Sequence, residues 1–395
     1  MQNNMTPTAS AERIHILDIL RGFAIFGILA VNIGGFATPQ FFPGYSIPAM
    51  PWYDNLAHNL MLFFAEGKFY SIFSFLFGLG FAVQLNRAQA KGRDINSFYP
   101  RRLWILFGFG ILHALLFWLG DILRLYALLG FVLLAFRNHT SRTLLVWTGI
   151  FFALSFFMLI LMGGPNGGNE PVPGIDLVSM AQQAYGGTSY LNILIFQGLI
   201  ILPSFIIIAL IQGFSVMALF LLGMLAGRSH FFEQLNENRH RLKRAFVTGL
   251  LIGIPGNALL IWAANPLWTS LGFTLGAPAL AVTYIAALSL ASLTQTGQKI
   301  LAPLASVGRM ALTNYFLQSV LCSILFSGYG AGLYEKIGAA GLWGITFLIY
   351  LAQIPFSMWW LSKFQFGPLE WVWRSLTYKQ RQPFIRAENP TGNLL

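Results

Sequence analysis

Charged side chains are scarce in this sequence: only 9% of its 395 residues are Asp, Glu, Lys or Arg, whereas a soluble domain carries roughly 25%. The single cysteine, Cys322, excludes an internal disulfide. The spacing of His and Cys predicts no metal site, and no P-loop occurs. The net charge of +11 is divided among alternate loops instead of forming one basic face, which argues against nucleic acid as a partner.

The sequence is instead rich in long apolar runs, and 56% of its residues are hydrophobic. Each run is long enough to cross about 30 Å of hydrocarbon as a helix, and the runs are continuous, which favours helices over a barrel. We therefore predict an all-α, polytopic transmembrane helical bundle in a lipid bilayer, with residues 1–395 as a single integral membrane domain. About ten spans are expected, at residues 14–36, 59–85, 103–119, 122–136, 143–163, 193–227, 244–264, 270–293, 304–326 and 338–361. Because residues 190–227 are too long for one ordinary span and contain Pro203, an interfacial or half-membrane piece is expected to precede the span there.

Lysine and arginine alternate between loops. Five lie within residues 85–103 and five within residues 228–244, whereas residues 36–58 contain none. The positive-inside rule then places both termini and every basic loop in the cytoplasm. The Gly- and Pro-rich loop 164–189 is expected to be external and mobile, and residues 362–395 to form a cytoplasmic tail.

Ionisable side chains within membrane spans cost about 2.5–3.5 kcal/mol each on insertion scales, so each one marks a candidate site. In the first span, Asp18, Arg21 and Asn32 share an arc of about 60° at ~100° per residue. This arc predicts either a substrate-binding stripe or an Asp–Arg pair that locks the helix to its neighbours. Glu66 and Lys68 lie in the outer half of the second span, where Lys68 can snorkel outward and Glu66 needs a partner.

The densest group of polar residues lies on the third and fourth spans and the tight turn between them. His113, Asp121 and Arg124 all approach the outer half of the membrane, and Tyr126 follows on the fourth span. A carboxylate that fixes the tautomer of a histidine and raises its basicity makes that histidine a general base. The alternative is a hairpin held by an Asp–Arg pair, with His113 bonded to a backbone carbonyl. His58, in or beside an external loop, is a second candidate base.

Three polar residues stand out in the segment SVGRMALTNYFLQS (306–319). Asn314 and Gln318 are four residues apart, share a helical face and can join helices by hydrogen bonds. Arg309 lies at the cytoplasmic entrance, where a guanidinium suits a phosphate or carboxylate.

Five segments together resemble the YeiB family of bacterial inner-membrane proteins, and the resemblance runs almost end to end. They are LDILRGFAIFGILAVNI (17–33), GKFYSIFSFLFGLG (67–80), RRLWILFGFGILHALLFWLGDILRLYALLG (101–130), SVGRMALTNYFLQS (306–319) and FGPLEWVWRSLTY (366–378). The family resemblance implies a multi-pass protein of the bacterial inner (cytoplasmic) membrane.

The N-terminal segment and the Arg-rich loop before GDILRLY are also distantly similar to the transmembrane acyltransferases, among them the lysosomal heparan glucosaminide acetyltransferase and bacterial sugar O-acyltransferases. This similarity implies transfer of an acyl group from cytoplasmic acyl-CoA to an acceptor across the membrane. Those enzymes use a histidine in the first helix or in the loop after it. Here Asn32 stands at the comparable depth, and His113 lies on a different helix.

The leading hypothesis is therefore a transmembrane acyl transferase with acyl-CoA as the donor and a hydroxyl or amine as the acceptor. His113, oriented by Asp121, is the expected base, and Asn32 or Lys68 is expected to stabilise the oxyanion. Asp18, Glu66, Arg124, Tyr126, Asn314 and Gln318 are further substrate-binding candidates. The residues expected to bind the phosphorylated donor are Arg13, Arg21, Arg101, Arg102 and Arg309.

Two other classes remain open. The same intramembrane groups suit a proton-coupled transporter or exporter of a small amphiphile or lipid precursor, or a sensor or accessory subunit without turnover. A closed pocket that joins the cytoplasm to the middle of the membrane favours transfer, whereas a path with two gates favours transport. The oligomeric state also stays open, a homo-oligomer included.

Overall fold

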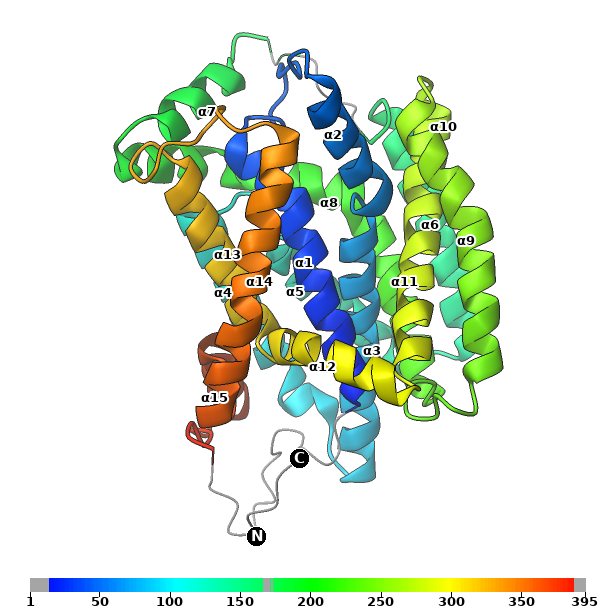
Figure 1. Ribbon diagram of the computed structural model, residues 1–395. Coiled ribbons are helices and arrows are strands. Elements are labelled where there is room, and N and C mark those ends of the chain that lie inside the picture. The colour runs from blue at the N-terminus through cyan, green and yellow to red at the C-terminus, as the bar shows by residue number, and fades with distance from the viewer. Residues whose placement is uncertain (1–13, 166–170, 172, 387–395) are drawn as a thin grey trace.

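The computed structural model describes residues 14–165, 171 and 173–386, and their elements are helices joined by short loops (Figure 1). Within these residues the sole β-type pairing is an isolated bridge between Phe364 and Ile385. The predicted all-α fold is confirmed. The elements are α1 (His15–Ala37), α2 (Trp52–Phe64), α3 (Lys68–Ala90), η2 (Ile95–Ser97), α4 (Tyr99–Leu116), α5 (Leu123–Ala135), η3 (Phe136–Asn138), α6 (Ser141–Leu161), α7 (Leu177–Gly186), α8 (Tyr190–Arg228), α9 (Arg239–Trp262), α10 (Pro266–Leu271), η4 (Gly272–Gly276), α11 (Ala277–Ala291), α12 (Gln295–Arg309), α13 (Ala311–Phe326), α14 (Ala339–Lys363) and α15 (Pro368–Tyr378).

Several helices of the bundle expose large apolar side chains. Leu161 of α6, Leu199 of α8 and Leu251 of α9 are 77%, 64% and 70% exposed. A water-soluble monomer rarely shows contiguous apolar surface on this scale, so these faces belong against lipid. The chain is a membrane protein.

Seven helical stretches in the described part of the chain are long and apolar enough to cross a membrane, and the shorter helix Ala311–Phe326 is also apolar. The seven are His15–Ala37, Trp52–Ala90, Ser141–Leu161, Tyr190–Arg228, Arg239–Trp262, Pro266–Ala291 and Ala339–Lys363. The hairpin of α4 and α5 falls outside this set, because α5 has 13 residues and α4 carries two arginines in its first turn. The count of about ten spans and the side of each terminus therefore stay predictions.

The structure adds detail to three local expectations. Residues 190–227 lie in one continuous 39-residue helix, α8, which passes through Pro203 without a break. The loop 164–189 contains a helix, α7, whose Ala181 and Ala184 are buried; residues 166–170 and 172 of that loop lie outside the described residues. Likewise the tail 362–395 begins with an ordered helix, α15, before its described part ends at residue 386.

The expected span 304–326 is divided into two helices, α12 and α13, at Met310. The cause lies on α15: the Glu370 carboxylate accepts hydrogen bonds from the backbone N–H groups of Leu312 and Thr313, at 2.7 and 3.1 Å. It also accepts one from the Thr313 hydroxyl at 2.6 Å. The first N–H groups of a helix have no partner within the helix, and a carboxylate there satisfies them and interacts favourably with the helix dipole. A new helix can therefore begin at Ala311.

Helix α12 crosses α1 at one end of the bundle, the end at which α15 also lies (Figure 1). We call this the basic end, because the arginines described below lie there. The crossing depends on two glycines: a Cβ at Gly308 would overlap the Asp18 carbonyl oxygen, and one at Gly22 would overlap the Leu304 carbonyl oxygen. The missing side chains let the two backbones touch, which places Arg309 beside α1.

We expect Gly308→Ala to lower the thermal stability of the purified protein, since an added methyl group must push α12 away from α1. Overpacking of this kind typically costs about 1–3 kcal/mol. The control is Gly198→Ala in α8, where an added Cβ meets nothing within 4 Å. Equal melting temperatures for the two variants would contradict the close crossing.

Candidate functional site

The basic end contains a cavity of about 320 Å³ that extends into the bundle. Helix α1 contributes Asp18 and Arg21 and, one to two turns further in, Ile25 and Ile28. Helix α3 runs in the opposite direction and lines the cavity from Phe73 to its last turn. The cavity is therefore polar at the basic end and apolar further in.

Five arginines from five elements line the polar part, together with two carboxylates. The arginines are Arg21, Arg87, Arg102, Arg309 and Arg374, and the carboxylates are Asp18 and Glu370. The Glu370 carboxylate accepts hydrogen bonds from the first turn of α13. Asp18 accepts a hydrogen bond of 2.9 Å from Arg21 Nη1. The cations outnumber the anions, so this part of the cavity favours a ligand with several negative charges.

Neighbouring arginines on α4 have different roles. The Arg102 guanidinium lies 3.7 Å from the centre of the Trp373 ring, in the cavity wall. Arg101 instead donates a hydrogen bond of 2.9 Å to the Thr377 carbonyl and does not line the cavity. Of the five arginines expected to bind a donor, the structure brings Arg21, Arg102 and Arg309 together; Arg13 lies outside the described residues.

Residues of α5 and α13 also line the cavity, among them Tyr126 and Tyr315. The Tyr126 hydroxyl lies 2.7 Å from Ser74 Oγ and donates to the Tyr70 carbonyl at 3.0 Å. Tyr315 faces the cavity and also packs on the His113 ring, with 4.6 Å between ring centres. Tyr315 thus contacts both the cavity and His113.

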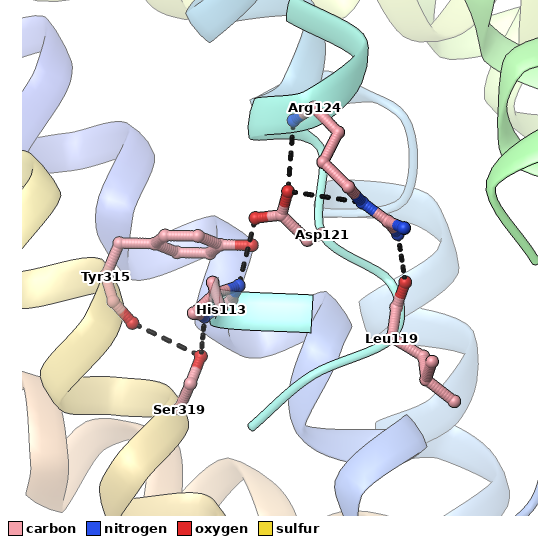
Figure 2. A network of polar contacts seen from close by, with 6 residues as sticks. All are labelled: His113, Leu119, Asp121, Arg124, Tyr315 and Ser319. Atoms are coloured by element: carbon pink, nitrogen blue, oxygen red, sulfur yellow. Dashed lines mark hydrogen bonds and ion pairs between the residues drawn. The ribbon is translucent and has the colours of Figure 1, made fainter. Parts of the chain in front are cut away.

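His113 is the centre of a buried polar network (Figure 2). Its Nδ1 lies 2.9 Å from Asp121 Oδ1 and its Nε2 lies 2.8 Å from Ser319 Oγ. The solvent exposure of these three residues is 0%, 0% and 2%. The predicted pairing of His113 with Asp121 is present, and a serine from α13 completes the group.

The surroundings of Asp121 indicate which nitrogen of His113 carries the proton. Asp121 Oδ2 accepts a hydrogen bond of 3.0 Å from the Arg124 backbone N–H and lies 3.7 Å from Arg124 Nε. A carboxylate held by these groups acts as an acceptor, so Nδ1 of His113 is the donor. Nε2 of a neutral imidazole is then an acceptor that faces the Ser319 hydroxyl.

Arg124 positions Asp121 and does not line the cavity. It is 2% exposed, and its guanidinium donates to the carbonyls of Leu119 and Ile201, at 2.9 and 3.2 Å. These bonds hold the turn between α4 and α5, as Figure 2 shows for Leu119. The Asp–Arg pair of the alternative interpretation, in which it only holds the hairpin, is therefore present. The same pair also holds Asp121 in its position beside His113.

The two residues predicted to stabilise the oxyanion, Asn32 and Lys68, lie away from the His113 network. Lys68 is buried at the start of α3 and donates a hydrogen bond of 2.7 Å to the Leu62 carbonyl, beside Glu66. Asn32, on α1, does not line the cavity. In the described part of the chain, neither Asn32 nor Lys68 has a hydrogen bond to the His113 network. The oxyanion role proposed for them has no geometric support here. His58, the second candidate base, lies half-buried on α2.

Asn314 and Gln318 join helices, as their spacing predicted. Asn314 Nδ2 donates to Ser357 Oγ at 3.0 Å, and Gln318 Nε2 donates to Gln353 Oε1 at 2.8 Å. Both partners lie on α14. Neither residue lines the cavity, so their contacts are structural and fix the orientation of α13.

Ser319 is the residue that sequence reasoning missed. It ends the segment SVGRMALTNYFLQS but lies 206 residues from His113. Its position one helical turn after Tyr315 places it on the face of α13 that contacts α4. No local signal distinguishes it from the many serines of helices. Among the residues that the structure describes, no group of three or more His, Cys, Asp or Glu side chains is placed to hold a metal ion.

Comparison with known proteins supports the resemblance seen in the sequence. The profile of the family described as "Protein of unknown function (DUF418)" matches residues 226–380. "Uncharacterized protein YxaH" of Bacillus subtilis (strain 168) is 36% identical over 404 positions, covering 97% of this chain and 99% of its own length. "Uncharacterized protein YeiB" of Escherichia coli (strain K12) is 32% identical over 398 positions, covering 95% and 98%. A Bacillus acidopullulyticus protein, "Uncharacterized 39.9 kDa protein in amylase 3'region", is 34% identical over 96% of this chain and 98% of its length. This identity over nearly the whole chain places it in the family of YeiB and YxaH.

Proposed function

We propose that this protein is a membrane-embedded acyl transferase that takes an acyl group from acyl-CoA and passes it to a hydroxyl or amine. One observation carries the proposal: a cavity with arginines at its entrance and apolar walls further in is lined by Tyr315, whose ring packs on the buried His113 of the His113–Asp121 pair.

The cavity suits an amphiphilic, phosphorylated donor. Guanidinium groups bind phosphate oxygens through charge-assisted, often bidentate hydrogen bonds, and the arginines at the entrance provide such donors from several directions. The whole cavity, at about 320 Å³, lies at the lower limit of small-ligand pockets, which are about 300–1,000 Å³. The phosphates of CoA would stay at the basic end, and the pantetheine arm with its thioester would extend inward.

His113 would act as the general base at the inner end. Its Nε2 is the acceptor in the tautomer that Asp121 favours, and a neutral imidazole with a positioned carboxylate is the usual proton acceptor in acyl transfer. By the positive-inside rule the basic end faces the cytoplasm, so the donor would enter from there, in the bacterial cytoplasmic membrane. The acceptor would approach from the opposite side.

The cavity suits transfer, because a donor needs to enter from one side only. A transporter needs a substrate path that opens alternately to both sides of the membrane. The cavity extends inward from the basic end, and a single state of either kind of protein can have this shape. A proton-coupled transporter remains the alternative that the experiment below is designed to distinguish.

The test is ligand binding followed by thiol release. Purified protein in detergent is expected to be stabilised by acetyl-CoA, longer acyl-CoAs and free CoA, since a ligand at 100 times its Kd adds about 2.7 kcal/mol to the free energy of unfolding. Pantetheine, which lacks the phosphates, is expected to stabilise it far less. Release of CoA thiol from a bound acyl-CoA would support transfer. Absence of a shift with every CoA compound would refute the proposal and favour transport.

A further inference from the structure

The His113 network has the geometry of a hydroxyl–imidazole–carboxylate relay. Ser319 Oγ lies 2.8 Å from Nε2, and Asp121 Oδ1 lies 2.9 Å from Nδ1 on the other side of the ring (Figure 2). In such a relay the serine hydroxyl is activated as a nucleophile, because the imidazole removes its proton as it attacks. The relay is recognised by this geometry, whatever the fold that carries it.

Ser319 has only a long version of the usual hydrogen bond of a helical serine. A serine within a helix commonly donates to the carbonyl four residues earlier. In α3, Ser71 and Ser74 do so at 2.6 and 2.8 Å. The corresponding distance from Ser319 Oγ to the Tyr315 carbonyl is 3.3 Å, longer than its 2.8 Å contact with His113. The imidazole is therefore the closer of the two hydrogen-bonding partners of Ser319 Oγ.

We propose that Ser319 is a catalytic nucleophile that carries the acyl group as a covalent ester between donor and acceptor. The inference rests on the proposed acyl transfer and specifies its route. A direct transfer needs donor and acceptor together at His113, whereas an acyl-serine lets CoA leave before the acceptor arrives. Such a two-step route suits a donor and an acceptor that come from opposite ends of the bundle, because the two need not be bound at the same time.

The chemistry balances in two steps. In the first, Ser319 Oγ attacks the thioester carbonyl carbon, Nε2 of His113 takes the hydroxyl proton, and the C–S bond breaks. The sulfur leaves as the CoA thiol with the proton from His113. In the second, an acceptor hydroxyl or amine attacks the ester carbonyl and gives its proton to Nε2. The Ser319 oxygen leaves and recovers that proton, and no oxidant or reductant is needed.

Tyr315 links the cavity to the helix that carries this serine. It lies one turn before Ser319, lines the cavity and packs on the His113 ring. The proposed route requires its side chain to move away from His113 so that a thioester in the cavity can reach Ser319 Oγ. The closed position keeps water from the relay, which protects an acyl-serine from hydrolysis.

The experiment is a search for the ester. Purified protein is incubated with acetyl-CoA, and in parallel with a long-chain acyl-CoA, without acceptor, and is analysed by intact and peptide mass spectrometry. We expect one acyl group per chain, on Ser319, with release of about one equivalent of CoA thiol in an initial burst. Hydroxylamine is expected to remove the group.

Two substitutions on α13 make the test specific. Ser319→Ala is expected to keep acyl-CoA binding, lose the ester and reduce thiol release by about three orders of magnitude or more. Ser323→Ala is the matched control, because Ser323 is also buried on α13 but bonds to the Tyr329 hydroxyl. If Ser319→Ala does not fold, Ser319→Cys replaces it and is expected to form a thioester of greater hydroxylamine lability.

The outcomes separate the two proposals. An ester on Ser319 in the wild type and in Ser323→Ala, absent from Ser319→Ala, supports both. Acyl-CoA binding with full thiol release by Ser319→Ala, or turnover without any ester, overturns the nucleophile and leaves direct transfer. Absence of binding and of thiol release with every acyl-CoA overturns the acyl transferase, and the nucleophile with it.

Discussion

Replacement of His113 by glutamine is expected to reduce thiol release from acyl-CoA by about 10²–10⁴-fold, the usual contribution of a positioned general base. Glutamine retains a hydrogen-bonding side chain but cannot take a proton from Ser319 or from an acceptor. His113 does not line the cavity, and the arginines are unaffected, so acyl-CoA should still stabilise the variant. The two measurements are the rate of thiol release and the thermal shift with acyl-CoA.

The control is His240→Gln, at an exposed position on α9, which should behave as the wild type. Because His113 is fully buried between Asp121 and Ser319, its loss can also lower stability. A second variant, Asp121→Asn, keeps the histidine but favours the wrong tautomer, and it should also lose activity while binding acyl-CoA. Wild-type release by either variant at equal folded concentration would show that His113 is structural.

Replacement of Arg309 by alanine is expected to weaken acyl-CoA binding by about ten- to one hundredfold, since a hydrogen bond to a charged group contributes about 1.5–3 kcal/mol. Arg309 lies at the joint between α12 and α13 and lines the entrance of the cavity with Arg21 and Arg102. The effect should fall on the phosphates of CoA, so pantetheine should bind the variant and the wild type alike. Kd values for CoA and acyl-CoA, measured at a fixed salt concentration, give the comparison.

The matched control is Arg244→Ala, an exposed arginine on α9 that does not line the cavity. It removes the same charge from the protein and should leave CoA affinity unchanged. A loss of equal size in both variants would indicate that general charge attracts the ligand. No loss in Arg309→Ala or in Arg102→Ala would mean that the donor does not occupy this cavity.

Local patterns in the sequence predicted the helical fold and one contact in the site, that of His113 with Asp121. The apolar runs predicted the helical fold because a run of about 20 apolar residues can satisfy its backbone in a membrane only as a helix. His113 and Asp121 are eight residues apart across one tight turn, so their contact follows from the hairpin. Arg21, Arg102 and Arg309 were found by their charge and place near the ends of apolar segments.

Neighbouring residues show where local patterns fail. Arg101 and Arg102 have the same chemistry, yet adjacent side chains on a helix point about 100° apart. Their partners on α15 decide that Arg102 lines the cavity and Arg101 holds a backbone carbonyl. Similarly, the apolar run 304–326 predicted one helix, and the distant Glu370 divides it by capping α13.

The sequence by itself determined the class of protein, its family and the histidine with its carboxylate, because each depends on residues that are close along the chain. Only the tertiary structure decided that Ser319 completes the group and that five arginines share one cavity. These contacts join α13 to α4 and bring five separate elements together. They depend on how whole helices cross, as at the glycine contact between α1 and α12, and the position of a helix crossing is set by packing over its full length, which no short segment encodes.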